Sequence, residues 1–213
     1  MTSMAARLVA VVAFAAAVTA TSTSASSSGA ANPFTAPRTE RYVVHFVPLD
    51  TRAGQLLRQV VPVARKWTHY PVEVTAVPSP GKGWTNTKRR QMNARAVVTD
   101  LLARFRRARG NTTAFIVPVT TASLYDPGTR LTFVFGLRAP VNGYQAAAII
   151  GTAPMRASHP ERETARLTKM TLRYLGEVVC RLPRNLNPKS VLFAGLASNG
   201  NLDAMVARLP RRC

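Results

Sequence analysis

The feature that most constrains the fold is an apolar stripe at helical spacing in the middle of the chain. Its members follow one another at steps of three or four residues: Ala94, Val97, Val98, Leu101, Leu102 and Phe105. This spacing predicts a helix that faces the core, ends before Gly110 and is capped by Asn86 or Thr87. Basic residues cover the rest of its surface, which is the usual pattern of a solvated helix face.

Segments of strand-like composition lie on both sides of this helix. They are rich in β-branched and apolar residues and cover 41–48, 70–77, 113–120, 131–137 and 146–152. Two more helices are predicted, over 53–67 and 160–182. The order of elements predicts an α/β or α+β fold, in which a mixed, twisted sheet packs against two to three helices. A chain of 213 residues suits one such domain better than two.

The N-terminus has the pattern of an export signal. Arg7 precedes the apolar run 8–18, and small residues follow, so residues 1–20 are predicted to be a signal peptide. The run is about half the roughly 20 residues that a spanning helix needs, so no transmembrane anchor is expected. We expect a flexible leader over 21–38, because its Ser, Ala, Pro and Gly residues cannot form a core, and the folded domain over 39–213.

The predicted location is therefore secreted or extracytoplasmic, and this bears on the two cysteines. An oxidising compartment favours a disulfide between Cys180 and Cys213. The alternative is a buried Cys180 and a free Cys213 at the end of the chain.

Few residues are available for catalysis. The chain has three histidines and nine carboxylates, with no nucleophile elbow and no dinucleotide fingerprint. His45, His69 and His159 are widely separated, so no pair has the spacing that places two metal ligands on one helical face. The residues alone thus predict neither a catalytic group nor a metal ligand.

The second half of the chain resembles the archaemetzincin branch of the metzincin zinc proteases. The segment 90–94, assigned here to the long helix, is similar to the family's Arg-x-Gln-Tyr-x-Ala stretch; 124–128 and 133–136 are similar to its Leu-Tyr and Phe-Val-Phe-Gly segment. Residues 148–151, continuing to Arg156, stand where the family has an edge strand. The resemblance implies a metzincin-like fold with a cleft beside that strand.

The same resemblance implies that the zinc site is lost. The family's helix carries His-Glu-x-x-His-x-x-Gly-x-x-His-Cys, in which three histidines bind zinc and the glutamate activates water. An alignment on Leu-Gly places Arg173 and Glu177 at the two helix histidines, Tyr174 at the general base, Cys180 at the glycine and Pro183 at the third histidine. At this i, i+4 spacing Arg173 and Glu177 can form an ion pair. Residues 190–193 stand at the methionine turn, and 202–205 resemble the closing helix.

These observations favour a secreted, non-catalytic binding or scaffold module without a cofactor. Its ligand would be a peptide or an anionic polymer, and its candidate cleft contacts are Ala147, Gly151, Arg156, Arg173 and Tyr174.

One alternative is a zinc-dependent hydrolase whose metal is bound by His45 or His159 with Glu177. Another is a cationic protein that binds cell-wall polymers, nucleic acid or membrane surfaces, since the net charge is +20. Aromatic residues are few and do not alternate with the basic ones, as base stacking on single-stranded nucleic acid would need, so this third hypothesis is less favoured.

Overall fold

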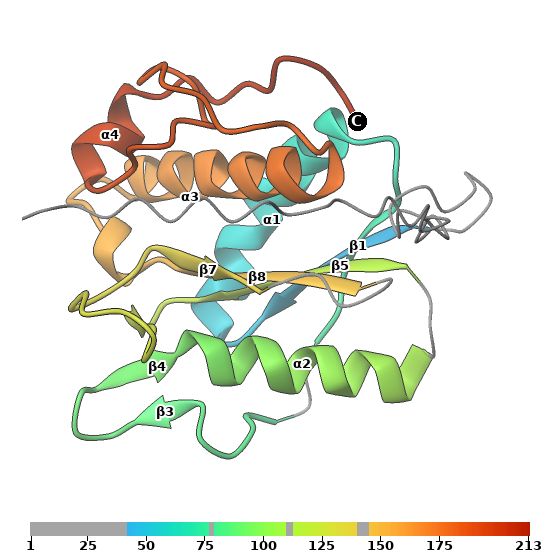
Figure 1. The fold of residues 1–213 in the computed structure, drawn as a ribbon, viewed down its shortest axis with the longest axis vertical. Coiled ribbons are helices and arrows are strands. Elements are labelled where there is room, and N and C mark those ends of the chain that lie inside the picture. The colour runs from blue at the N-terminus through green and yellow to red at the C-terminus, as the bar shows by residue number, and fades with distance from the viewer. Residues whose placement is uncertain (1–41, 77–78, 110–112, 140–144) are drawn as a thin grey trace, which may run out of the picture. The chain divides into compact units, whose positions relative to one another are not determined.

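The computed structural model describes residues 42–76, 79–109, 113–139 and 145–213 (Figure 1). The predicted signal peptide and leader lie outside these residues. A five-stranded sheet has the order β2-β1-β5-β8-β7. Its strands are β1 (Val43–Pro48), β2 (Val72–Val74), β5 (Ala114–Thr120), β7 (Gly136–Arg138) and β8 (Gln145–Gly151). All neighbours pair in parallel except β7, which runs antiparallel to β8, so the sheet is mixed, as predicted.

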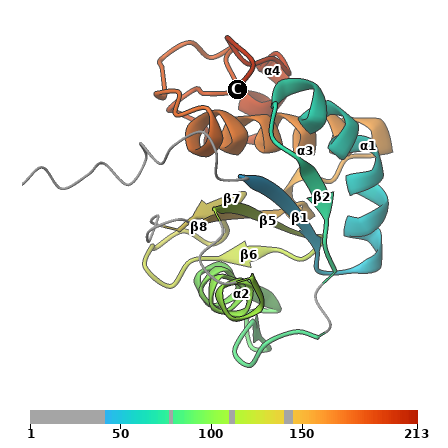
Figure 2. The same ribbon diagram turned by 90° about the vertical axis from the view of Figure 1, so that its right-hand side faces the viewer.

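Helices cover both faces of this sheet (Figures 1 and 2). Helices α1 (Thr51–Trp67) and α3 (Pro160–Tyr174) pack on one face, and α2 (Ala94–Arg109) packs on the other. Successive strand residues point to opposite faces, so Phe115 joins the core under α1 and α3 while Ile116 joins the core under α2. Every residue of β5 and β8 is buried, which is typical of central strands covered on both sides.

Helix α2 begins later than the sequence predicts. Its first residue is Ala94, and the capping by Asn86 or Thr87 was wrong. Asn86 instead lies in β3 (Thr85–Asn86), which pairs with β4 (Gln91–Asn93), and β4 pairs with β6 (Leu124–Tyr125). The Asn93 side chain accepts a hydrogen bond from the Ala96 amide at 3.1 Å. Pairing with a distant strand thus decides where the helix starts. The predicted apolar stripe is buried, apart from the half-buried Leu102.

The edge of the sheet also differs from the prediction. Strand β8 lies between β5 and β7, so β7 forms the edge and the assignment of the edge to 148–151 was wrong. Strand β7 starts only at Gly136, and the preceding residues Leu131 and Phe133 are exposed outside any strand. Strand β2 is likewise shorter than the predicted 70–77.

The long C-terminal helix changes character before it ends. α3 stops at Tyr174, and the π-helix η2 (Leu175–Val179) continues it, with the Cys180 amide donating to the Leu175 carbonyl at 3.0 Å. The chain then turns at Arg181, whose φ is 52°, and reaches the short helix α4 (Asn199–Ala204). A 3-10 turn, η1 (Ala153–Met155), precedes α3. No helix within the described ranges is long and apolar enough to cross a membrane.

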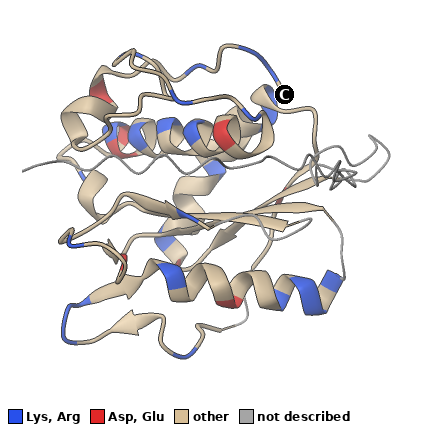
Figure 3. Ribbon diagram, viewed as in Figure 1, with Lys and Arg blue, Asp and Glu red and all other residues tan. Residues whose placement is uncertain are grey.

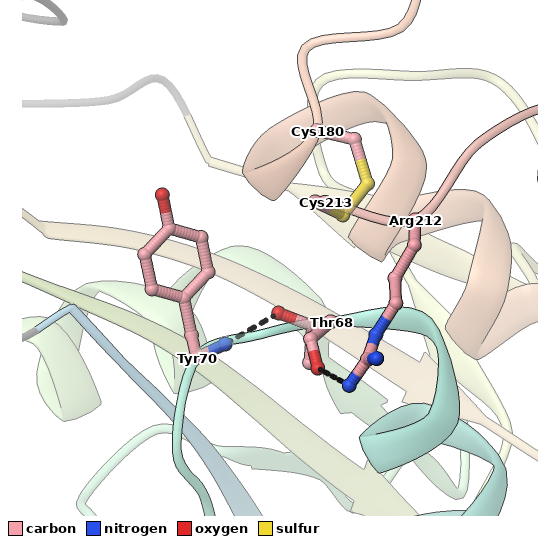
Figure 4. The surroundings of a disulfide bond; sticks show 5 residues. All are labelled: Thr68, Tyr70, Cys180, Arg212 and Cys213. Carbon is pink, nitrogen blue, oxygen red and sulfur yellow. Dashed lines mark hydrogen bonds between the residues drawn. A yellow bond between two sulfur atoms is a disulfide. The ribbon is translucent and has the colours of Figure 1, made fainter.

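A disulfide fixes the C-terminal end of the chain (Figure 4). Cys180 and Cys213 are bonded with their Cα atoms 4.9 Å apart, in agreement with the predicted pairing. The Cys213 amide donates to the Trp67 carbonyl at 3.1 Å, and the Cys213 carbonyl accepts from the His69 amide at 2.8 Å. Arg212 donates to the Thr68 carbonyl at 3.2 Å. The last residues are thus attached both to the end of η2 and to the connection between α1 and β2.

Candidate functional site

The aligned motif positions gather where α3 passes into η2. Arg173 and Tyr174 end α3, Glu177 lies within η2, and Pro183 follows beyond the turn. Gly176 allows two other segments to approach the helix, because a Cβ there would lie 2.7 Å from Leu209 Cδ2 and 2.9 Å from Leu192 Cδ2. The helix end is therefore closely packed against the chain that follows it.

Arg173 and Glu177 form the ion pair that their spacing predicts. Arg173 Nε lies 3.1 Å from Glu177 Oε1, and the two side chains are only 5% and 3% exposed. Arg173 Nη1 also donates to the carbonyl oxygens of Val191, at 3.2 Å, and Phe193, at 2.6 Å. Burial lowers the pKa of Arg173, and the charge of Glu177 opposes that shift. Arg173 thus connects the helix to the turn that aligns with the methionine turn of metzincins.

Two further arginines, Arg138 and Arg184, approach Glu177, and neither contact was expected from the sequence. Arg184 donates from Nε to Oε1 at 2.9 Å and from Nη2 to Oε2 at 3.1 Å, and this hydrogen bonding raises the pKa of Arg184. Arg138 Nη1, from β7, lies 3.9 Å from Oε2. Arg184 directly follows the third aligned ligand position, which could have signalled it. Arg138 could not be found, because the edge strand had been assigned to the wrong segment.

Tyr174, which the sequence resemblance aligns with the general base, is a packing residue in this structure. Its side chain lies against Gly136 of β7, where a Cβ would be 2.7 Å from the Tyr174 hydroxyl oxygen and 2.4 Å from the Ile149 carbonyl oxygen. Gly136 is therefore the residue that lets Tyr174 reach the sheet. Burial raises the pKa of Tyr174, so the phenol stays protonated at neutral pH.

These side chains do not fit a zinc ion. A zinc site of the metzincin type needs three protein donors in tetrahedral arrangement. Arg173 has no lone pair to donate, Pro183 has no donor atom in its side chain, and both Glu177 oxygens already accept hydrogen bonds from Arg184. The chemistry of the donor set is thus that of an internal salt bridge.

The histidines do not supply a replacement metal site. In the part of the chain that the structure describes, no three His, Cys, Asp or Glu side chains are grouped so that they could hold a metal ion. His159 lies at the N-terminal end of α3, and the rise of a helix places it roughly 20 Å from the end that leads to Glu177. His45 is buried in β1, with Nδ1 3.1 Å from the Thr75 hydroxyl. The proposed ligand set of His45 or His159 with Glu177 is not brought together.

The other predicted cleft contacts also lie away from Glu177 or are inaccessible. Ala147 and Gly151 are buried inside β8. Arg156 follows η1, before the N-terminal end of α3, and donates to the Thr121 carbonyl at 3.2 Å. Of the arginines and tyrosine predicted to line a cleft, Arg173 and Tyr174 lie at the C-terminal end of α3 and Arg156 lies at the opposite end.

A groove of about 670 Å³ lies elsewhere on the domain. It runs along α1 toward β2, with Leu57, Val61 and Val74 in its wall and Arg58 and Arg65 beside them. Strand β2 forms one edge of the sheet and β7 forms the other, so this groove is remote from Glu177. Its position gives it no part in the site at the end of α3.

Comparison with known proteins supports the fold. No family model and no curated protein matches the sequence. Among solved structures, archaemetzincin from Methanopyrus kandleri is 22% identical with a TM-score of 0.59, over 82% of this chain and 92% of that one.

Two more solved structures are similar to the same extent. Archaemetzincin from Archaeoglobus fulgidus, in complex with malonate, is 20% identical with a TM-score of 0.56, over 80% of this chain and 95% of that one. A zinc-dependent peptidase from Methanocorpusculum labreanum is 18% identical with a TM-score of 0.59, over 78% and 94%. The chain therefore has the fold of these archaemetzincin and zinc-dependent peptidase structures.

Proposed function

We propose that this chain is an exported protein that does not hydrolyse peptides and uses a metzincin-like fold as a binding or scaffold module. The observation that carries the proposal is the buried pair of Arg173 and Glu177. The sequence resemblance aligns these two residues with the helix histidines that bind zinc in metzincins. Both charges of the pair have partners and hydrogen bonds within the protein, so neither needs a metal ion or another ligand to balance it.

The position of the catalytic base supports the same proposal. Hydrolysis by a metzincin needs a carboxylate that takes a proton from the attacking water. The sequence resemblance aligns Tyr174 with that carboxylate, and burial raises the pKa of Tyr174, so the phenol stays protonated at neutral pH and does not act as a base. Glu177, the nearest carboxylate in the motif, is hydrogen bonded by Arg184 through both oxygens.

Export is supported by two independent features of the chain. Residues 1–20 have the pattern of a signal peptide, and the cysteine pair is bonded, which oxidising compartments favour. Expression of the full chain in a secreting host tests this part: N-terminal sequencing of the exported product should show cleavage near residue 20. Uncleaved protein retained inside the cells would contradict export.

The loss of zinc binding is tested by metal analysis with a restored motif as the positive control. The chain is equilibrated with zinc, freed of excess and analysed by mass spectrometry beside the variant Arg173→His, Tyr174→Glu, Glu177→His, Pro183→His. We expect zinc and peptidase activity to be negligible in the wild-type protein, and zinc to be retained by the variant if it folds. Stoichiometric zinc in the wild-type protein, lost on mutating His45 or His159, would replace this proposal by a hydrolase with a different metal site.

A second candidate function is binding of anionic polymers, and the surface of α2 favours it. Basic residues gather toward the C-terminal end of this helix (Figure 3). Arg104 pairs with Asp100 and Arg109 approaches Glu73, whereas Arg106 and Arg107 form no ion pair with a described residue. Retention on a polyphosphate column that falls steeply with added salt, and that falls further for Arg106→Gln with Arg107→Gln, would support this function.

A further inference from the structure

The charges at the end of α3 are unequal. Arg138, Arg173 and Arg184 each form an ion pair with Glu177, and within the described ranges none of the three pairs with another carboxylate. One negative charge therefore faces three positive charges. Such an excess raises the local positive potential and attracts anions.

The three arginines differ in how many of their donors are used. Arg173 is buried, and its hydrogen bonds go to Glu177 and to two backbone carbonyls. Arg184 donates from Nε and Nη2 only, and its side chain is 50% exposed. Arg138 is 47% exposed and donates no hydrogen bond to a described residue, because its approach to Glu177 is 3.9 Å. Each guanidinium has five N–H groups, so Arg138 and Arg184 keep donors for a ligand.

The two exposed arginines lie close enough to share one ligand. Both approach the same oxygen, Glu177 Oε2: Arg184 Nη2 at 3.1 Å and Arg138 Nη1 at 3.9 Å. Their nitrogens are therefore separated by less than the sum of these two distances. A carboxylate or phosphate group can accept a charge-assisted hydrogen bond from each of two donors at such a separation.

We propose that Arg138 and Arg184 form a binding site for a small oxyanion, a carboxylate or phosphate group, above the buried pair of Arg173 and Glu177. The buried pair forms the floor, since Glu177 holds Arg184 in place through two hydrogen bonds. The anion balances the excess positive charge. The inference rests on the proposed function, because a metal held at the same helix end would require other ligands there.

The test is a titration of the whole protein with sodium acetate and, separately, sodium phosphate. Sodium chloride holds the ionic strength constant, and the Arg138 and Arg184 side-chain Nε–H signals are followed by NMR. We expect these signals to shift in a saturable manner with at least one of the two anions. The anion that binds more tightly identifies the group, a carboxylate or a phosphate, that the natural ligand carries.

Arg138→Gln is the informative variant, because Arg138 donates no hydrogen bond to a described residue and its loss should leave the fold intact. It should weaken anion binding by about tenfold or more, as expected for loss of a charged hydrogen bond. Arg58→Gln, which removes the same charge from the exposed surface of α1, should bind as the wild-type protein does. Shifts that stay linear, or equal binding by the Arg138→Gln and wild-type proteins, would overturn the proposal.

The outcome is separable from that of the metal analysis. Zinc retained by the wild-type protein would contradict the proposed function. A zinc-free protein that shows no saturable anion binding would contradict this inference alone.

Discussion

The two ends of α3 differ in how their charged side chains are paired (Figure 3). At the N-terminal end, Glu163 is buried and accepts hydrogen bonds from Arg52 and from the Thr152 hydroxyl. One turn further, Arg166 pairs with Asp203 through two hydrogen bonds, at 2.8 and 2.6 Å. Glu163 and Asp203 each pair with one arginine. At the C-terminal end, three arginines form ion pairs with the same carboxylate, that of Glu177.

The difference separates a structural role from a binding role. Paired charges at the N-terminal end join α3 to α1, through Arg52 and Glu163, and to α4, through Arg166 and Asp203. The C-terminal end keeps a buried pair as its structural part and adds two half-exposed arginines whose charge is not balanced. A fold that needed only a replacement for a metal would require Arg173 and Glu177 but not Arg138.

The largest effect should come from removing the carboxylate at each end. Glu177→Gln leaves Arg173 buried without a countercharge, and breaking a buried pair in this way costs about 3–5 kcal/mol of unfolding free energy. Glu163→Gln should cost less, about 1–3 kcal/mol, because Arg52 is 51% exposed and can turn to water. Urea unfolding of both variants measures the difference. Equal losses would show that the two ends are not distinct.

The disulfide adds a restraint that only the C-terminal end of α3 has. Its sequence separation is 33, for which chain entropy gives about 3–4 kcal/mol of stabilisation. Cys213→Ser should lower the unfolding free energy by nearly this amount in urea. Reduction of the wild-type protein should give a similar loss, and Cys213→Ser should not respond to reductant. A loss well below 1 kcal/mol would show that the C-terminal segment is held by its backbone hydrogen bonds instead.

Close packing beneath the C-terminal end is tested at Gly136. Gly136→Ala places a Cβ near the Tyr174 hydroxyl and the Ile149 carbonyl, and such overpacking costs about 1–3 kcal/mol. Gly54→Ala is the control, because its Cβ would have only Pro48 Cβ nearby, at 3.8 Å. That change lies within α1 and should stabilise the protein by about 0.5–1 kcal/mol. Thermal unfolding that shifts both variants in the same direction would contradict the packing argument.

The smallest effect should be the pH dependence at the N-terminal end. Hydrogen bonding to Arg166 lowers the pKa of Asp203 below its ordinary value of 3.8, so the pair stabilises the fold above that value and the contribution is lost as the pH falls through the lowered pKa. Asp203 is partly exposed, which limits the contribution to about 1 kcal/mol or less. The stability difference between wild type and Asp203→Asn should be present at neutral pH and shrink toward zero in acid. A difference that is constant with pH would exclude this pair as its source.

The sequence predicted those parts of the molecule that depend on local pattern. The stripe from Ala94 to Phe105 has the period of a helix and is buried, and the spacing of Arg173 and Glu177 correctly predicts their ion pair. The cysteines also pair as the export pattern favours.

The errors arose where distant pairing decides the structure. The long helix was predicted to start at about Asn86 or Thr87, but β3 (Thr85–Asn86) pairs with β4 (Gln91–Asn93), and β4 pairs with β6. The edge strand was misplaced because β7 is only three residues long, and this error concealed Arg138. A guanidinium that reaches a helix from another strand has no fixed sequence spacing, so periodicity could not reveal it.

The measurement that tests the central claim most directly is a double-mutant cycle on the buried pair. Unfolding free energies are measured for wild type, Arg173→Met, Glu177→Gln and the double variant. If the pair replaces a metal as the support of the helix end, the double variant should be at least about 2 kcal/mol more stable than the sum of the two single losses predicts, since it contains no unpaired buried charge. Losses that simply add would show that Arg173 and Glu177 act independently and would contradict the account.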